Sequence, residues 1–371
     1  MNFTCSKNDL IEAFNIVSKA VSNKSQMPIL SGIYMKAEGS TLELQANNFE
    51  IGIITKIPVN TEEPGEIILT GKYLQEIVRK LSGEIVNISH DESQHVANIK
   101  SGGANFKLLS MSIDDFPKVK SPETFSSFSM KASTLKNLIR KTAYACANEE
   151  VRPVFTGCCI EIVGNSISMV ATNTHRLAVM KDKINEEVDM PPIVVPSKTL
   201  WELFKMLDTS DLSNTVKIEC SRKNISFTFD NIYMTARLID GQFPPYDKVI
   251  PKESATIATI NVNEIMETVD RVALISKETE HNTIRFIFSA EEGVNISSDS
   301  PEVGRAEEQI SAKIEGPTVD ISFNVRYIVD VLKVIDTEEC IIKLNKSLSP
   351  VDIREKDRDD FIYVVTPVRT N

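Results

Sequence analysis

The sequence lacks two features that would place the protein in or across a membrane. It has no run of about 18 apolar residues, so it predicts no membrane-spanning helix. Its first ten residues, MNFTCSKNDL, are polar and include an acid, which argues against a secretory signal peptide. We therefore expect a cytoplasmic protein.

The sequence also lacks paired cysteines. Its six cysteines are scattered, and none forms a C-x-x-C motif. Two of them are adjacent in the apolar run TGCCIEIV, which favours reduced, half-buried thiols over a disulfide or a metal site. The cysteines are Cys5, Cys146, Cys158, Cys159, Cys220 and Cys340.

Recognisable catalytic motifs are missing as well. There is no Gly-x-Ser-x-Gly, no His-Glu-x-x-His and no Walker-type glycine loop. Aspartate and glutamate are abundant, but none clusters in the spaced pattern of a polymerase metal site. The sequence therefore predicts no catalytic residue, no metal and no cofactor, and it disfavours a polymerase or nuclease with an active site of its own.

The net charge of −11 argues against a protein that simply coats nucleic acid, because such proteins are usually basic overall. It does not exclude a local basic surface, since a summed charge says little about where the field points.

What the chain does contain is an internal repeat. Segments that start at Phe3, Phe128 and Ala258 each read as a short strand, a polar turn and a helix, at offsets of 125 and then 130 residues. Capping or dipole-favoured residues open the three predicted helices. These residues are Asp9, Thr134 and Glu264.

Two further elements repeat in the same order. GKYLQEIVRKL, SKTLWELFKML and NVRYIVDVLKVI share apolar positions at helical spacing. LQANNFEIGIIT, MVATNTHRLAVM and NISSDSPEVGRAEEQI each place a polar turn between two strand-like runs, and the first two repeats also close alike, with SIDDFPKV and LIDGQFPPY. Three elements in one order at nearly one offset indicate a triplication.

The repeat predicts an α+β protein of three domains, near residues 1–125, 126–250 and 251–371. Pro-containing segments after Phe116 and Phe243 separate them. The remaining runs, such as TLELQA, VKIECS and NISFTF, alternate at period two. Each domain is therefore expected to pack two helices against antiparallel sheet.

The six windows predicted as helices carry a net charge of +7, which leaves −18 on the rest of a chain of −11. One interpretation is that long helices simply favour Lys and Arg. The other is that the helices share a face that meets a polyanion, for which loosely spaced cations suffice. The candidates are Lys24, Lys72, Arg79, Arg140, Lys141, Lys198, Lys205 and Lys333.

Over its whole length the chain resembles the bacterial DNA sliding clamp, the beta subunit of DNA polymerase III. The most specific segments are MPIL at 27–30, ATNTHRLAV at 171–179, LIDGQFPPY at 238–246, FNVRYIVDVL at 323–332 and YVVTPVR at 363–369. The resemblance implies a homodimeric head-to-tail ring of six domains whose helices line a hole around duplex DNA. It implies a processivity factor without an active site, and it adds Arg152 to the DNA-facing candidates.

The resemblance also implies a seam between the first domain of one chain and the third domain of the other. The matching residues would otherwise be ordinary core residues. Here we expect an edge strand completed by a strand of the partner, with apolar groups beneath it. The four residues are Phe106, Leu108, Leu274 and Ile275.

By itself, the turn that holds His175 and Arg176 would more often be structural than catalytic. The resemblance makes it part of a hydrophobic pocket for Gln-Leu-x-Leu-Phe-like peptides of the polymerase, the clamp loader and repair proteins. Arg176 and Arg369 are expected to meet a peptide carbonyl or carboxylate. The implied pocket residues are Phe155, Thr172, Thr174, His175, Arg176, Leu177, Pro244, Lys248, Val249, Val364, Pro367, Val368 and Arg369.

The chain departs from the family pattern at several of these positions, which puts the peptide preference in doubt. Thr174 stands where glycine is usual, and a β-branched residue there would be strained if φ were positive. Phe155, Lys248 and Thr366 also differ from common family residues. The alternative function is a three-domain interaction scaffold with no DNA role, which would not explain the charge difference between the helices and the rest.

Overall fold

A computed structural model describes residues 1–22, 26–148, 152–276 and 282–369. Among these residues, no helix is long and apolar enough to cross a membrane. Every strand pairing within the sheets is antiparallel, as the period-two runs predicted. The six α-helices of the described residues are α1 (Lys7–Val17), α2 (Gly71–Lys80), α3 (Ala132–Thr142), α4 (Ser197–Met206), α5 (Val262–Ser276) and α6 (Val325–Leu332).

The helices begin close to where the repeat predicted. The side chain of Ser6 caps α1 and accepts a hydrogen bond from the backbone N–H of Asp9 at 3.5 Å. Asn261 Oδ1 likewise accepts from the backbone N–H of Glu264 at 3.1 Å, at the start of α5. Asp9 and Glu264 therefore lie in the first helical turn, where the helix dipole favours an acid, and their neighbours supply the caps.

By contacts the chain divides into two compact units. Unit 1 comprises Met1–Ser133 and Lys205–Leu238, and unit 2 comprises Thr134–Phe204 and Ile239–Asn371. The middle third of the chain therefore contributes to both. The boundaries near residues 125 and 250 stay predictions about the repeat, because strands from different thirds are joined in continuous sheets.

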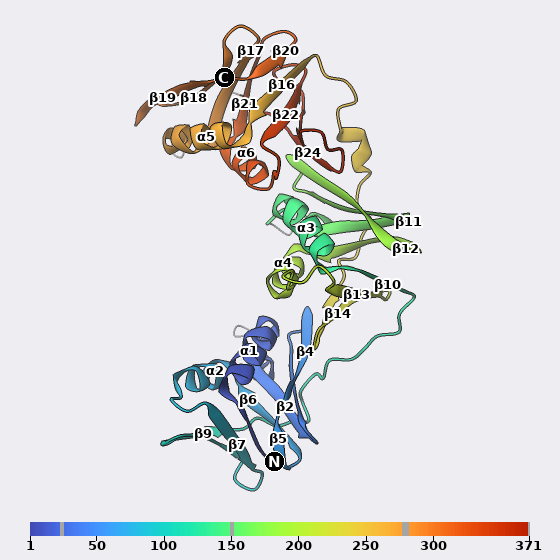
Figure 1. Cartoon of the computed structure of the whole chain (residues 1–371), viewed down its shortest axis with the longest axis vertical. Coiled ribbons are helices and arrows are strands. Elements are labelled where there is room, and N and C mark those ends of the chain that lie inside the picture. Colours follow the sequence, from blue (N-terminus) through green and yellow to red (C-terminus); the bar gives the residue numbers. More distant parts are fainter. Residues whose placement is uncertain (23–25, 149–151, 277–281, 370–371) are drawn as a thin grey trace. The chain divides into compact units, whose positions relative to one another are not determined.

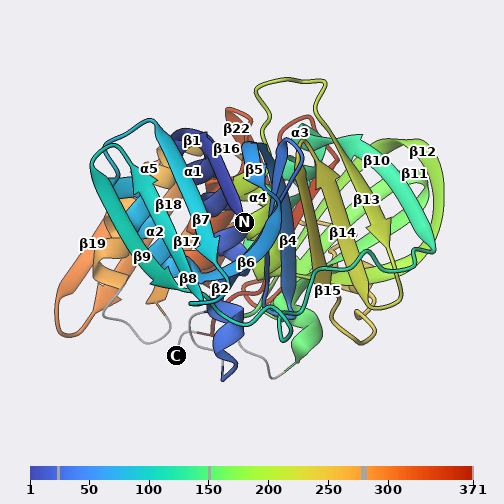
Figure 2. The ribbon, with the colours of Figure 1, turned by 90° about the horizontal axis from the view of Figure 1, so that it is seen from below.

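Unit 1 contains two sheets. Its strands are β1 (Asn2–Ser6), β2 (Gly32–Glu38), β3 (Thr41–Asn47), β4 (Ile51–Pro58), β5 (Asn60–Glu63), β6 (Gly65–Thr70), β7 (Ile85–Asp91), β8 (Val96–Ser101), β9 (Ala104–Leu109), β10 (Ser126–Lys131), β13 (Thr215–Cys220), β14 (Asn224–Phe229) and β15 (Ile232–Arg237). The five-stranded sheet has the order β5-β1-β7-β8-β9, and the eight-stranded sheet has the order β10-β13-β14-β15-β4-β3-β2-β6. Figure 2 shows β15 beside β4, where Met234 faces Ile53.

Unit 2 also contains two sheets. Its strands are β11 (Gly157–Thr172), β12 (Arg176–Pro196), β16 (Thr256–Asn261), β17 (Thr283–Ser289), β18 (Gly293–Ser300), β19 (Gly304–Ile310), β20 (Lys313–Glu315), β21 (Val319–Asn324), β22 (Glu339–Leu344), β23 (Val351–Glu355) and β24 (Phe361–Val365). The seven-stranded sheet has the order β11-β12-β24-β23-β22-β16-β20, and the four-stranded sheet has the order β19-β18-β17-β21 (Figure 1).

The helices bury their apolar stripes against these sheets. In unit 1, α1 packs on β3, β4 and α2, and Leu10, Phe14 and Val17 are buried. In unit 2, α5 packs on β18, β19 and α6. Full burial of one such side chain stabilises the fold by about 1.5–3 kcal/mol. The predicted α+β architecture, with helices packed on antiparallel sheet, is confirmed.

Candidate functional site

The ATNTHRLAV segment forms a tight turn between β11 and β12 in unit 2. Asn173 Oδ1 accepts hydrogen bonds from the backbone N–H groups of His175 at 3.1 Å and Arg176 at 3.0 Å. Thr172 Oγ1 donates to the carbonyl of Arg176 at 2.6 Å and accepts from the N–H of Thr174 at 3.1 Å. Short polar side chains thus satisfy the backbone groups that the turn exposes.

Thr174 occupies a strained position in this turn. Its φ is +76°, in the left-handed region that disfavours β-branched residues. The strain expected from a threonine at a glycine position is therefore present, and the side chain is exposed.

The C-terminal tail is fastened to the same turn. β24 pairs with β12, so that Val364 faces Leu177 and Val365 faces Arg176. Thr366 donates to the carbonyl of His175 from its backbone N–H at 2.9 Å and from its hydroxyl at 3.0 Å. This pairing brings together segments that lie almost 200 residues apart in the sequence.

We call residues 172–177, 243–249 and 364–369 the second joint. Beneath it lies an apolar cluster of buried side chains against which Phe243 and Ile250 also pack: Cys159, Val170, Leu177, Val179, Tyr246, Ile362 and Val364. Phe155 is buried and meets the ring of Phe243 edge-on, with centroids 6.2 Å apart. The structure therefore gathers Phe155, Leu177 and Val364 from three distant segments.

The other predicted pocket residues form a more exposed rim. Val249 keeps 52% of its surface exposed and lies next to the apolar cluster in sequence. Thr172, Pro367 and Val368 are half-buried, whereas Thr174, His175, Pro244, Lys248 and Arg369 are exposed.

Arg176 corrects one prediction. Its side chain is only 5% exposed, and Nη1 forms an ion pair with Asp330 Oδ2 at 2.6 Å. Its other terminal nitrogen donates to the carbonyl of Tyr144, and the guanidinium lies 4.7 Å from the ring centroid of Tyr327. The prediction that this guanidinium meets a peptide is wrong, because α6 and the core already occupy it. Arg176 holds the turn in place instead.

His175 is exposed beside Tyr327 of α6. Its ring stacks on Tyr327 with centroids 6.4 Å apart and an interplanar angle of 16°. Asn173 Nδ2 donates to the Tyr327 hydroxyl at 3.3 Å. In the part of the chain that the structure describes, no group of three or more His, Cys, Asp and Glu side chains could hold a metal ion.

The half-buried supports of the second joint escaped the sequence analysis. Tyr327 and Asp330 lie in the quoted FNVRYIVDVL segment but were seen only as part of a helix. Asn173, by contrast, was recognisable, because asparagine in a polar turn between strands is a typical turn-closing residue.

Two of the predicted DNA-facing cations, Lys141 and Arg140, form ion pairs within the protein. Lys141 is fully buried, and its ammonium pairs with Glu355 at 2.5 Å and Asp336 at 3.1 Å, so the prediction that it faces DNA is wrong. Arg140 also pairs with Asp336, at 2.5 Å. Burial alone would raise the pKa of Asp336, but hydrogen bonds from Arg140 and Lys141 outweigh it and lower that pKa. Lys24 lies outside the described residues.

The remaining candidates are exposed. Arg79 donates to Asn15 Oδ1 at 2.6 Å, which fixes it beside α1. Arg152 lies 5.9 Å from the centroid of the Phe155 ring. The exposed cations are Lys72, Arg79, Arg152, Lys198, Lys205 and Lys333.

The predicted seam residues lie on two different elements. Phe106 and Leu108 are on β9, the edge strand of the five-stranded sheet, and Phe106 is 40% exposed. Leu274 and Ile275 end α5, and Leu274 is 64% exposed. Exposed apolar residues at a sheet edge are typical of a surface that pairs with another chain.

All six cysteines are free and buried, more deeply than the half-buried state predicted. Burial raises the pKa of Cys159 to about 12, and it also raises the pKa of Cys158. Both therefore remain protonated thiols at neutral pH and are poor nucleophiles.

Comparison with known proteins gives one consistent result. Three family models match in order: the N-terminal, central and C-terminal domains of the DNA polymerase III beta subunit, over residues 1–120, 129–245 and 247–369. The chain is 33% identical to the beta sliding clamp of Bacillus subtilis (strain 168), with 100% of both chains covered. Its structure matches the crystal structure of the Bacillus subtilis DNA polymerase sliding clamp with a TM-score of 0.95 at 33% identity. It also matches a Pseudomonas aeruginosa sliding clamp bound to griselimycin, with a TM-score of 0.94 at 30% identity, and both structural matches cover 100% of each chain.

Proposed function

The chain belongs to the DNA polymerase III beta subunit family of sliding clamps, and on that premise we propose that two copies close head to tail around duplex DNA and tether the replicative polymerase. The observation that carries this proposal is the ordered match of three clamp domains across residues 1–369. A closed ring holds DNA by topology, so weak contacts suffice, and tethering raises the effective concentration of the polymerase at its template.

DNA contact is proposed for the exposed cations on or near the helices and for the half-buried Arg140. The exposed cations are Lys72, Arg79, Arg152, Lys198, Lys205 and Lys333. Lys24 stays a candidate from the sequence alone. Lysine and arginine at loose spacing neutralise phosphates without reading bases, which suits a protein that must slide. Lys141 is excluded because a buried, paired ammonium does not reach a phosphate.

The seam is proposed at β9 of one chain and α5 of the next. β9 has a neighbour on one side only in its sheet, so its outer edge can accept a strand of the partner. Phe106 and Leu274 would lose their exposed apolar surface there. Sedimentation of the Leu274→Lys, Ile275→Lys double variant tests this: a monomer is expected, whereas a variant that remains dimeric would place the seam elsewhere.

The second joint is proposed as the docking site for short partner peptides of the Gln-Leu-x-Leu-Phe type. Its apolar cluster and the exposed Val249 suit leucine and phenylalanine anchors. Lys248 and Arg369 are exposed cations at its rim, so they replace Arg176 as the groups able to meet a carboxylate. That a related Pseudomonas aeruginosa clamp binds griselimycin supports ligand binding in this family.

Val249→Asp tests the docking site without disturbing the core. A fluorescein-labelled Gln-Leu-Ser-Leu-Phe peptide should bind the wild type saturably, and Val249→Asp should weaken it by about tenfold or more, as loss of a buried anchor contact does. The matched control is Val303→Asp, since Val303 is 54% exposed in a different turn. Equal weakening by both variants, or no binding by the wild type, would contradict the proposal.

We further propose that the protein acts as a polymerase accessory subunit with no active site of its own, and that it works in the cytoplasm with the chromosome. Both follow from family membership. Fractionation and an incorporation assay without polymerase would test them: membrane association, or nucleotide incorporation by the pure protein, would contradict them.

A further inference from the structure

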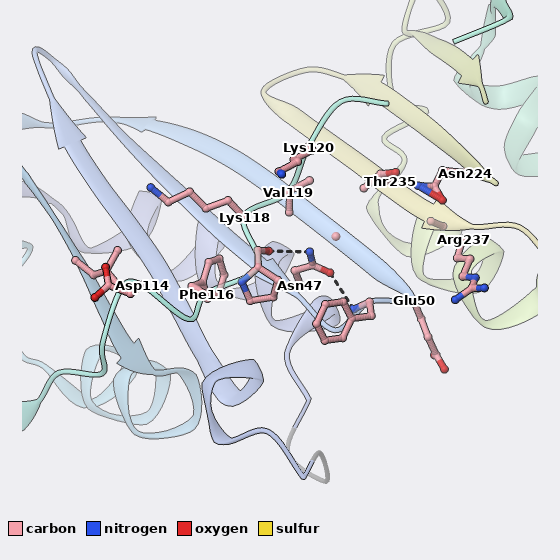
Figure 3. Close-up of a pocket in the computed structure, with 15 residues that line it drawn as sticks. Asn47, Glu50, Asp114, Phe116, Lys118, Val119, Lys120, Asn224, Thr235 and Arg237 are labelled. Atoms are coloured by element: carbon pink, nitrogen blue, oxygen red, sulfur yellow. Dashed lines mark hydrogen bonds between the residues drawn. The ribbon is translucent and has the colours of Figure 1, made fainter. Parts of the chain in front are cut away.

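A cavity of about 680 Å³ opens within unit 1 (Figure 3). Three segments and Asn224, at the start of β14, line it: residues 47–52, which form the turn between β3 and β4; residues 113–120, which follow β9; and residues 235–237 at the end of β15. We call these three segments the first joint. None of the peptide-docking residues proposed above belongs to it.

The first joint repeats three side-chain hydrogen bonds of the turn in the second joint. Asn48 Oδ1 accepts from the N–H groups of Glu50 at 3.0 Å and Ile51 at 2.8 Å, as Asn173 does from the second and third residues after it. Asn47 Oδ1 accepts from the N–H of Phe49 at 2.9 Å, in the role of Thr172. The sequence repeat of LQANNFEIGIIT and MVATNTHRLAVM is therefore also a repeat of backbone geometry.

The strand that crosses the turn is repeated too. Gly52 faces Thr235 across β4 and β15, as Leu177 faces Val364 across β12 and β24. The N–H of Arg237 donates to the carbonyl of Glu50 at 2.9 Å, matching the bond from Thr366 to His175. The connecting segment is anchored by Asn47, whose amide donates to the carbonyl of Pro117 at 2.8 Å (Figure 3).

What differs is how the two joints are filled. Gly52 stands where the second joint has Leu177, and Val119 stands where it has Tyr246. The two larger side chains belong to a packed apolar cluster. Without a side chain on Gly52, Val119 and Thr235 lie close over it, and a cavity lies beside them. Its volume falls within the range of roughly 300–1,000 Å³ that is usual for ligand sites.

Phe49 supports a binding role for this cavity. It lines the cavity with 56% of its surface exposed and has a φ of +70°, a strained value for an aromatic residue. Burial in the core does not account for a strained, exposed ring. Strained residues that a fold maintains tend to occur where ligands bind.

The lining holds two cations that a ligand carboxylate could meet. Lys118 Nζ forms an ion pair with Glu66 Oε2 at 3.0 Å. Within the described part of the chain, no side-chain partner is found for Lys120 or Arg237. The carboxylate of Asp114 lies across the cavity from Arg237 (Figure 3).

Glu50 is a second exposed carboxylate on the rim, so the lining carries three cations and two acids.

We propose that the first joint is a second peptide-docking site, which takes a short segment bearing a bulky apolar residue flanked by acidic residues. The choice of a peptide as ligand rests on the function proposed for the second joint. The cavity, the exposed ring and the free cations stand independently of it. The two joints would then select different partners, because the second offers a filled apolar cluster and the first an open cavity whose lining includes Lys120 and Arg237.

The test uses the full-length protein carrying Val249→Asp, which disables the second joint. The probe is fluorescein-labelled Asp-Leu-Asp-Leu-Phe, and the comparison probe is Gln-Leu-Ser-Leu-Phe, which lacks the acids. We expect saturable binding of the acidic probe to this variant. Adding Lys120→Glu with Arg237→Glu should weaken it by about tenfold or more, because both charge partners are reversed.

The matched control is Lys100→Glu with Lys131→Glu, two exposed lysines of unit 1 that do not line the cavity. It changes the net charge by the same amount and should leave the affinity within about twofold, since exposed charges at a distance are screened. Phe49→Gly, which also relieves the strained φ, should weaken the probe without loss of stability.

Three outcomes would overturn the proposal: no binding of the acidic probe to the Val249→Asp protein, equal weakening by the cavity and control pairs, or displacement of the probe by a single-stranded oligonucleotide that binds Lys120 and Arg237 instead. Failure of the docking function proposed for the second joint would be a separate result. It would appear as no binding of Gln-Leu-Ser-Leu-Phe to the wild type, whatever the acidic probe does.

Discussion

The two joints share the same turn geometry but differ in the side chains that fill them. Each is a turn closed by an asparagine side chain, crossed by a strand and bounded by a connecting segment. The second is packed by Leu177 and Tyr246 and secured by a buried arginine, whereas the first has Gly52, Val119 and Ile51 at those places. The comparison indicates that the repeat preserves hydrogen bonds in the turn while side-chain volume and charge are free to diverge.

The largest predicted effect concerns Arg176, the residue that follows the turn of the second joint. Arg176→Ala should lower the free energy of unfolding by about 3 kcal/mol, because it leaves Asp330 without its 2.6 Å partner and opens a void between two tyrosines. Denaturant titration measures it, with the exposed Arg369→Ala as control, expected within about 0.5 kcal/mol. Equal stability of the two variants would mean that Arg176 does not secure the turn.

Next in size is the volume of the second joint. Leu177→Ala should make it hollow and lower the free energy of unfolding by about 2–3 kcal/mol, since Leu177 is 3% exposed in a packed cluster. The matched control is Leu348→Ala, because Leu348 is 54% exposed. If Leu177→Ala and Leu348→Ala unfold at the same denaturant concentration, Leu177 does not pack the second joint, and the contrast in packing between the two joints is contradicted.

The reverse change crowds the first joint. A Cβ on Gly52 would lie 3.0 Å from Val119 Cγ2 and 3.1 Å from Thr235 Cγ2, so Gly52→Ala should destabilise by about 1–2 kcal/mol and reduce binding of the acidic probe. Gly103→Ala is the control, because a Cβ there meets nothing within 4 Å. A neutral Gly52→Ala with unchanged binding would show that Val119 yields easily and that Gly52 does not create the cavity.

The smallest predicted effect is a gain in stability when the strained residue of either turn is replaced by glycine. Thr174→Gly and Phe49→Gly remove a Cβ at φ +76° and +70°, and each should stabilise by about 0.5 kcal/mol after the entropy of glycine is subtracted. Thr174→Ala and Phe49→Ala retain the Cβ and should show no such gain. Thermal unfolding that ranks alanine above glycine at either position would show that the turn is not strained there.

Much of the fold could be predicted from the sequence because its causes are local. Helical spacing, period-two runs and capping residues lie within a dozen positions of the elements they create. The turn of the second joint was recognisable for the same reason. The resemblance to the clamp family pointed to the departure at Thr174, whose positive φ the structure shows.

What could not be predicted depends on residues distant in sequence. Lys141 read as one more helix cation, yet it is buried by pairing with Glu355, 214 positions away. Arg176 read as a ligand-binding group, yet Asp330 holds it from 154 positions away. Gly52 and Val119 were visible in the repeat, but the cavity required knowing that the connecting segment packs across the turn.

The central claim, that this clamp holds DNA by encircling it, can be tested directly. A fluorescently labelled clamp is loaded onto a nicked circular plasmid with a bacterial clamp loader and ATP, and the mixture is separated by gel filtration before and after one restriction cut. Encirclement predicts that the label elutes with the circle and is released once the plasmid is linear, because a sliding ring runs off the ends. Retention of the label on linear DNA would show that contacts, not topology, hold the protein, and would contradict the account.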